Sequence, residues 1–202
     1  MNQESQFVAT KSKLVLPKRE ESFLAIDFET ADYQSDSPCA IGLARVEGNE
    51  IVHKESHLIR PPRSRILFTH IHGITWNHVR SCPTFQELWP MISHHFVGIH
   101  YLVAHNAGFD RKVLLTSCEI AGITPPSVPF LCTVQISKAC WQTKPNDLAS
   151  VCQRLKIGLN HHDAGSDAEA AARIMIAAIQ MKTPSESPQH EPPTLFRELP
   201  SS

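Results

Sequence analysis

The sequence predicts an α/β domain in which a mixed β-sheet is covered by helices. Three segments of strand length come first, and further strand segments then alternate with segments of helical periodicity. The composition agrees, because 42% of the 202 residues are hydrophobic and 19% are charged. A chain of this length can form one domain with a sizeable core.

The first three strands are expected near the N-terminus. Residues 23–28 form a short apolar run, which is typical of a buried strand. Two further strands are expected over residues 39–46 and 51–59. The segment Glu47-Gly48-Asn49 between them has the composition of a hairpin turn.

Strands and helices alternate in the rest of the domain. Thr84 and Glu87 have the spacing of a capping box, and apolar residues then recur at helical intervals. A fourth strand is expected over residues 101–104, followed by a helix over 109–122 that a glycine ends. A fifth strand is expected over residues 130–134.

The C-terminal part of the domain is predicted to be helical. Asn146 is expected to cap a helix that stops at Gly158, and a last helix should cover residues 163–181. Residues 1–20 are polar and are interpreted as a flexible arm. Residues 182–202 hold five prolines and no glycine, which is typical of a disordered tail.

Charge and composition exclude few functions. The net charge of −1 argues against a generally basic nucleic-acid binder, but carboxylates that bind metal ions are counted here without their ions. No apolar run reaches the roughly 18 residues that span a membrane. The N-terminus lacks a signal-peptide core, so a cytoplasmic protein is expected. Six scattered cysteines favour reduced thiols over disulfides or zinc.

Asp27 and Glu29 stand at the end of the first predicted strand. Residues two apart in a strand face the same side of the sheet, so the two carboxylates project together. Like charges this close repel each other unless a cation lies between them. The alternative is a pair of solvated acids at a strand end, since this pattern alone is common.

Two further motifs lie where a helix begins. Asp110 follows the fourth strand, at the end of a sheet where α/β proteins bind ligands, although it could serve only the helix dipole. His162 precedes the last helix and Asp167 lies in its first turn; a surface histidine beside a capping acid is the alternative. Four carboxylates and one histidine together indicate metal-assisted hydrolysis.

The order of these motifs, D-x-E, H-N-x-x-x-D and H-x-x-x-x-D, resembles that of the DEDDh, or DnaQ-like, exonucleases. The resemblance covers about residues 22–181. Segments 37–42 and 71–75 are similar to the branch of the family that contains the proofreading subunit of bacterial DNA polymerase III. It implies an RNase H-like fold, with three antiparallel strands extended by parallel ones, and 3′→5′ exonuclease activity.

The resemblance also implies a role for each of the five signature residues. Asp27 would bridge two divalent cations, Mg²⁺ or Mn²⁺. Glu29 and Asp167 would hold the cation that carries the attacking water, and Asp110 would serve the second. His162 would accept the proton from that water.

His161 is rejected as the base, because only His162 has the spacing to Asp167 that the family shows. Phe109 is expected in the core. By resemblance, three residues would lie near the terminal nucleotide of the substrate: Thr30 through its backbone, and His72 and Asn106 through their side chains. Local hydrogen bonds in turns are the alternative for each of the three.

Single-stranded DNA is the expected substrate, because the proofreading-like segments favour DNA. An RNA-trimming exoribonuclease is the first alternative, and a module that only binds nucleic acid or a partner is the second. The intact signature counts against the second. In the tail, the apolar pair Leu195 and Phe196 has the character of a short anchor on a flexible tether, for which a polymerase or sliding clamp is the expected partner. Gln189 lies upstream at a spacing that does not match a compact clamp-binding peptide, and an end that contacts nothing is the alternative.

Overall fold

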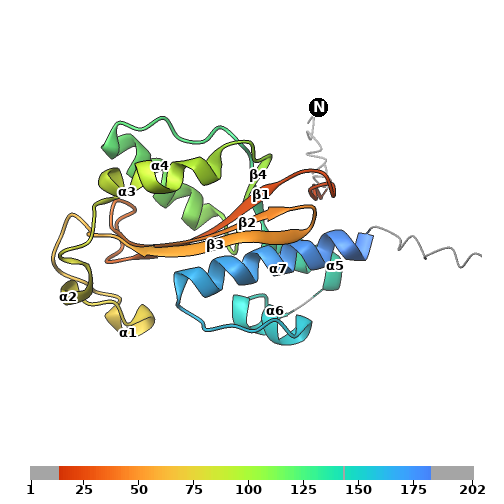
Figure 1. The fold of residues 1–202 in the computed structure, drawn as a ribbon. Coiled ribbons are helices and arrows are strands. Elements are labelled where there is room, and N and C mark those ends of the chain that lie inside the picture. The colour runs from red at the N-terminus through yellow and green to blue at the C-terminus, as the bar shows by residue number, and fades with distance from the viewer. Residues whose placement is uncertain (1–13, 143, 183–202) are drawn as a thin grey trace, which may run out of the picture.

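A computed structural model describes residues 14–142 and 144–182. Its centre is a five-stranded sheet in the order β3-β2-β1-β4-β5. Helices cover both faces of this sheet (Figure 1). The predicted α/β class and mixed sheet are therefore confirmed.

The first three strands are antiparallel. Strand β1 (Phe23–Thr30) pairs with β2 (Pro38–Glu47), which pairs with β3 (Glu50–Leu58) at the edge of the sheet. The hairpin predicted between β2 and β3 is present. Its two turn residues, Gly48 and Asn49, have φ values of 58° and 68°, the left-handed conformation that a two-residue turn needs to match the strand twist.

The remaining two strands extend the sheet in parallel. Strand β4 (Tyr101–Ala104) pairs with β1, and β5 (Phe130–Cys132) pairs with β4. Helix α4 (Gly108–Ala121) connects them and ends at Gly122, which is left-handed, as predicted. The predicted fifth strand is two residues too long, because helix α5 (Thr133–Trp141), which was not predicted, begins there.

One face of the sheet packs against α4, α3 (Phe85–Ile92) and the 3₁₀ helix η1 (Ser93–Phe96). The capping box predicted at the start of α3 is present: Thr84 N donates to Glu87 Oε2 at 2.8 Å, and Glu87 N donates back to Thr84 Oγ1 at 3.3 Å. The core on this face contains alternate residues of β1 and β2, including Leu24, Ile26, Phe28, Ile41 and Leu43.

The other face packs against α7 (Ala164–Lys182), the last helix of the domain. The small side chains of Ala171, Ala172 and Ala178 meet Ala25 and Ala44 of the sheet, all fully or almost fully buried. Small residues on both sides let the helix lie close to the strands, and Figure 1 shows α7 running along the sheet. The helix occupies nearly the range that the sequence predicts.

Helix α6 (Leu148–Leu155) differs at both ends from the prediction. Its cap is Asp147 rather than Asn146, since Asp147 Oδ1 accepts a hydrogen bond from Ser150 N at 2.9 Å. It ends at Lys156, which takes the left-handed conformation, so the chain leaves the helix before Gly158. The expected cap and stop at Asn146 and Gly158 are therefore wrong.

Two short helices, α1 (Thr69–His72) and α2 (Trp76–Val79), follow β3 and were not predicted. Leu14 and Leu16, within the segment expected to be a flexible arm, pack against the core on the α7 face. The tail residues Gln189, Leu195 and Phe196 lie outside the described residues. No helix of the described ranges has the length and apolar character to cross a membrane. The six cysteines are free thiols, as expected.

Candidate active site

Three carboxylates converge on the face of the sheet that α7 covers. Asp27 and Glu29 lie on β1 and alternate with Phe28, which belongs to the opposite core. Asp167 lies in the first turn of α7 and is 4% exposed. One oxygen of each of these three groups lies within 4.8 Å of the others. The predicted pairing of Asp27 with Glu29 on one face is thus observed, and Asp167 joins them.

Asp110 is the fourth carboxylate and reaches the site from α4. Its side chain is 1% exposed, and its Oδ1 accepts a hydrogen bond from Phe28 N at 3.0 Å. This bond ties the start of α4 to β1 between the two strand carboxylates. The charge of Asp110 also raises the pKa of Asp27, which places the two groups in one electrostatic site.

The start of α7 is held over β2 by its own backbone and by a glycine. Asp163 Oδ1 accepts a hydrogen bond from Ser166 N at 2.9 Å, which is the bond that caps a helix. Gly42 of β2, the residue opposite Asp27, faces Ala164 without an intervening side chain. This close approach brings Asp167 to the end of β1.

Burial and mutual repulsion shape the electrostatics of the site. Burial raises the pKa of Asp27 well above its ordinary value, and Asp110, Asp167 and Glu29 raise it further. Burial and the charges of Asp167, Asp110 and Asp163 raise the pKa of Glu29 to about 8, and burial raises the pKa of Asp110 to about 7. The four carboxylates cannot all carry a charge here without a compensating cation.

The donor set fits hard divalent cations. Asp167 Oδ1 is buried and has no hydrogen-bond partner among the described residues. A buried oxygen without a partner is unfavourable, and a metal ion would satisfy it. Oxygen donors from four carboxylates are the ligands that Mg²⁺ and Mn²⁺ prefer.

Both histidines of the motif lie at the start of α7, in different positions. His161 Nδ1 lies 3.1 Å from Asp167 Oδ2, and His162 contacts the same oxygen through its backbone N at 3.1 Å. The two rings stack with centroids 3.8 Å apart. His162 lines a small cavity together with His72 and Ala40. The contact of His161 with Asp167 was not anticipated from the spacing.

The three residues expected near a terminal nucleotide differ in their surroundings. His72 Nδ1 accepts a hydrogen bond from Ile74 N at 3.0 Å, so its Nε2 carries the proton and donates to Thr30 O at 3.2 Å. This bond links α1 to the end of β1. Asn106 is exposed at the entry of α4, where its φ is 68°.

Phe109 does not lie in the core as expected, because 44% of it is exposed. It precedes Asp110 in the first turn of α4. Since Asp110 points inward to Phe28 N, its neighbour in the helix points outward. Phe109 is therefore an exposed aromatic residue that precedes Asp110 in the chain.

Comparisons with known proteins agree on one family. The family model described as "Exonuclease" matches residues 24–175. The PolC-type DNA polymerase III of Thermotoga maritima is 31% identical over 169 residues, which are 79% of this chain and 12% of that protein. Exodeoxyribonuclease 10 of Escherichia coli strain K12 is 31% identical over 160 residues, covering 75% of this chain and 66% of that protein.

Solved structures show the same fold. Exonuclease X in complex with 5′ overhanging duplex DNA is 27% identical, with a TM-score of 0.65 over 79% of this chain and 92% of the other. The structure of a 3′-exonuclease recognising the 3′ end of a histone mRNA stem-loop has a TM-score of 0.70 at 15% identity, over 84% of this chain and 67% of the other. That second likeness concerns the fold alone.

Proposed function

Because this chain belongs to the exonuclease family, as its motifs predict, and has the family's RNase H-like fold, we propose that it hydrolyses nucleic acid from the 3′ end. The convergence of four acidic groups at one end of the sheet carries the proposal: Asp27, Glu29, Asp110 and Asp167. Phosphodiester hydrolysis requires stabilisation of negative charge on the phosphate oxygens, and buried carboxylates cannot supply this without cations.

The same four carboxylates would hold two divalent cations, Mg²⁺ or Mn²⁺. When bound, such ions activate water and stabilise the attacking and leaving oxygens of a phosphodiester. The protein supplies the fixed arrangement: Asp27 and Glu29 are held by the β1–β2 ladder, and Asp110 by the backbone of β1. The raised pKa values of Asp27 and Glu29 reflect burial and repulsion by neighbouring carboxylates, and bound cations would offset both effects.

His162 is the proposed general base, because its spacing to Asp167 is that of the DEDDh pattern. Its backbone N–H already contacts Asp167, which keeps it at the site. His161 is the competing candidate, since its ring is the one within hydrogen-bond distance of Asp167 Oδ2. The two assignments predict different mutant phenotypes.

Single-stranded DNA is the proposed substrate. Exodeoxyribonuclease 10 and the DNA complex of exonuclease X support DNA by similarity. Exposed Phe109 next to Asp110 offers a ring on which a terminal base can stack, a contact that single strands permit. The alternative substrate is RNA, because the enzyme of the histone mRNA complex shares this fold.

A polymerase partner is also proposed. The PolC-type relatives are much longer proteins, and this chain matches 12% of their length, so the domain is found within a polymerase there. Here the tail residues Leu195 and Phe196 are the proposed contact with a polymerase or clamp. Truncation after Lys182 should abolish retention by an immobilised partner and leave activity on free oligonucleotides intact.

The proposed activity is tested with 5′-labelled DNA and RNA strands of one sequence, in Mg²⁺ or Mn²⁺. Stepwise shortening from the 3′ end, with DNA cut faster than RNA, is the expected result. Faster cutting of the RNA strand would assign the alternative substrate. A closed circular single strand is the control, and its cleavage at a similar rate would overturn the exonuclease proposal.

A further inference from the structure

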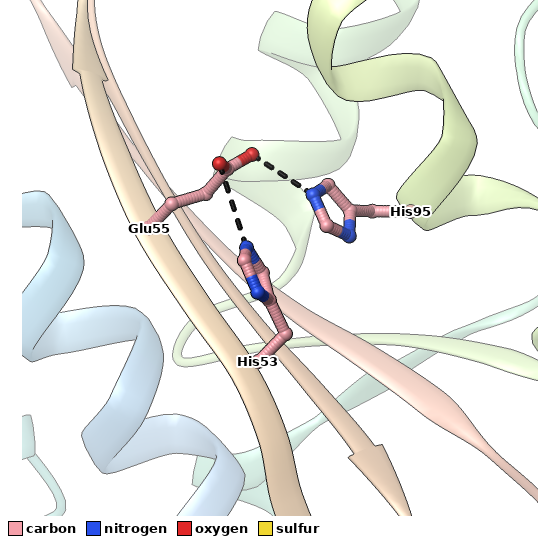
Figure 2. Close-up of side chains that lie close together, drawn as sticks. All are labelled: His53, Glu55 and His95. Carbon is pink, nitrogen blue, oxygen red and sulfur yellow. Dashed lines mark ion pairs between the residues drawn. The ribbon is translucent and has the colours of Figure 1, made fainter.

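A second cluster of metal-binding side chains lies on the opposite face of the sheet from the carboxylates. It comprises His53 and Glu55 of β3 and His95 of η1, and is called the edge cluster here because β3 is an edge strand. Figure 2 shows both imidazole rings pointing at the carboxylate of Glu55. Glu55 pairs with Leu43 of the α3–α4 core, whereas Asp27 lies on the α7 side.

The ligand atoms of the edge cluster are close enough for one ion. His95 Nε2 lies 3.0 Å from Glu55 Oε1, and His53 Nε2 lies 3.5 Å from Glu55 Oε2. One ligand atom from each of the three residues falls within 4.8 Å of the other two. The two rings are stacked with centroids 4.5 Å apart, and the Nε2 atom of each faces Glu55.

Burial leaves two of these atoms without a hydrogen bond. The His95 side chain is 6% exposed, and neither its Nε2 nor Glu55 Oε1 has a hydrogen-bond partner among the described residues. The two atoms are close but not aligned for a hydrogen bond. His57 Nε2 lies 3.3 Å from the same oxygen and is equally unpartnered within that part of the chain. Buried polar atoms that lie this close without an aligned hydrogen bond are unfavourable, and a shared cation would satisfy all of them.

The backbone holds these ligands in place before any ion arrives. His53 and Glu55 are fixed by pairing with Arg45 and Leu43 of β2. Arg45 also reaches across to η1, where its Nη1 donates to the carbonyl oxygens of His95 at 2.8 Å and Val97 at 3.0 Å. The edge strand and η1 are thus positioned by contacts that do not use the three ligand atoms.

We propose that the edge cluster is a zinc-binding site that joins β3 to η1. Two imidazole nitrogens and one carboxylate oxygen suit Zn²⁺, whereas Mg²⁺ prefers oxygen donors alone. Three protein ligands leave one position of a tetrahedral ion for water or a further ligand, and His57, whose Nε2 lies 3.3 Å from Glu55 Oε1, is the candidate for it. The site is separate from the catalytic carboxylates in both position and donor chemistry.

The test is calorimetric titration of the metal-stripped full chain with Zn²⁺ in an excess of Mg²⁺, which occupies the oxygen-donor site. We expect one tightly bound equivalent of Zn²⁺ per chain. In a separate thermal melt, this Zn²⁺ should raise the melting temperature of the protein. Glu55→Gln and His53→Ala should each weaken binding by at least about tenfold. His53 is half exposed, so its loss should leave the fold intact.

Two controls distinguish this site from the others. Glu50→Gln removes an exposed acid from the same strand and should bind zinc like the wild type. The double variant His161→Ala/His162→Ala removes the imidazoles at the catalytic carboxylates and should also keep the tight equivalent. Unchanged zinc binding by Glu55→Gln and His53→Ala, or its loss in the double variant, would overturn the proposal.

Discussion

A β-carbon on Gly42 would lie 1.8 Å from the carbonyl oxygen of Ala164, so β2 and the start of α7 meet backbone to backbone. No side chain fits between them. Because Gly42 is opposite Asp27, this contact sets how far Asp167 stands from the carboxylates of β1. One position without a side chain therefore controls the assembly of the site.

Gly42→Ala should displace the start of α7 and separate Asp167 from Asp27 and Glu29. Overpacking of this kind lowers the free energy of unfolding by about 1–3 kcal/mol. We expect nuclease activity to fall by a larger fraction than the free energy of unfolding. Gly158→Ala is the matched control, because a β-carbon there meets nothing within 4 Å. Thermal melting and single-turnover hydrolysis of both variants measure the effect. Equal activity in the two would contradict this account of Gly42.

Asp27→Asn should abolish hydrolysis and also stabilise the metal-free protein at pH 8. Activity should be lost because Asp27 is the proposed ligand shared by the two cations. Stability rises because a buried carboxylate repelled by Asp110 and Asp167 is replaced by a neutral amide. Melting curves in EDTA and activity in Mg²⁺ provide the two readouts. Glu119→Gln, which removes an exposed acid of α4, should change neither quantity.

The strands, the last helix and the four carboxylates were predictable because each depends on local pattern. Apolar runs identify strands, and a D-x-E pair on a strand faces one side whatever follows. The helix α5 was missed because Thr133 and Val134 are β-branched and continue an apolar run, so they were assigned to a strand. Asn146 and Asp147 are both good caps, and only the fold selects the second.

The parts of the site that were not predicted depend on contacts across the fold. His162 has a φ of 66° and contacts Asp167 through its backbone N, whereas His161 contacts the same oxygen through its ring. Spacing along the chain carries no signal for that. The alternation of His53, Glu55 and His57 was visible in the sequence, but His95 reaches them only through the packing of η1 against the sheet.

The stability of the metal-free protein should fall as the pH rises through neutrality. The pKa of Glu29 is raised from 4.5 to about 8, so the folded state binds this proton more tightly than the unfolded state. The contribution of this proton to the free energy of unfolding is fully present below about pH 4.5 and is lost as the pH rises toward 8. His72 and His95, whose pKa values burial lowers, act in the opposite direction. The test is therefore the difference between wild type and Glu29→Gln, melted in EDTA across this range. If the difference in melting temperature between wild type and Glu29→Gln does not change with pH, the raised pKa of Glu29 would be contradicted.

The roles of the two neighbouring histidines can be separated by paired substitution. If His162 is the general base, His162→Ala should reduce kcat at least about a hundredfold, and His161→Ala should change it little. His161 is the ring in contact with Asp167, and its loss removes that hydrogen bond. The opposite pattern, with His161→Ala inactive and His162→Ala near wild type, would assign the base to His161 and show that this contact, rather than spacing along the chain, identifies the catalytic imidazole.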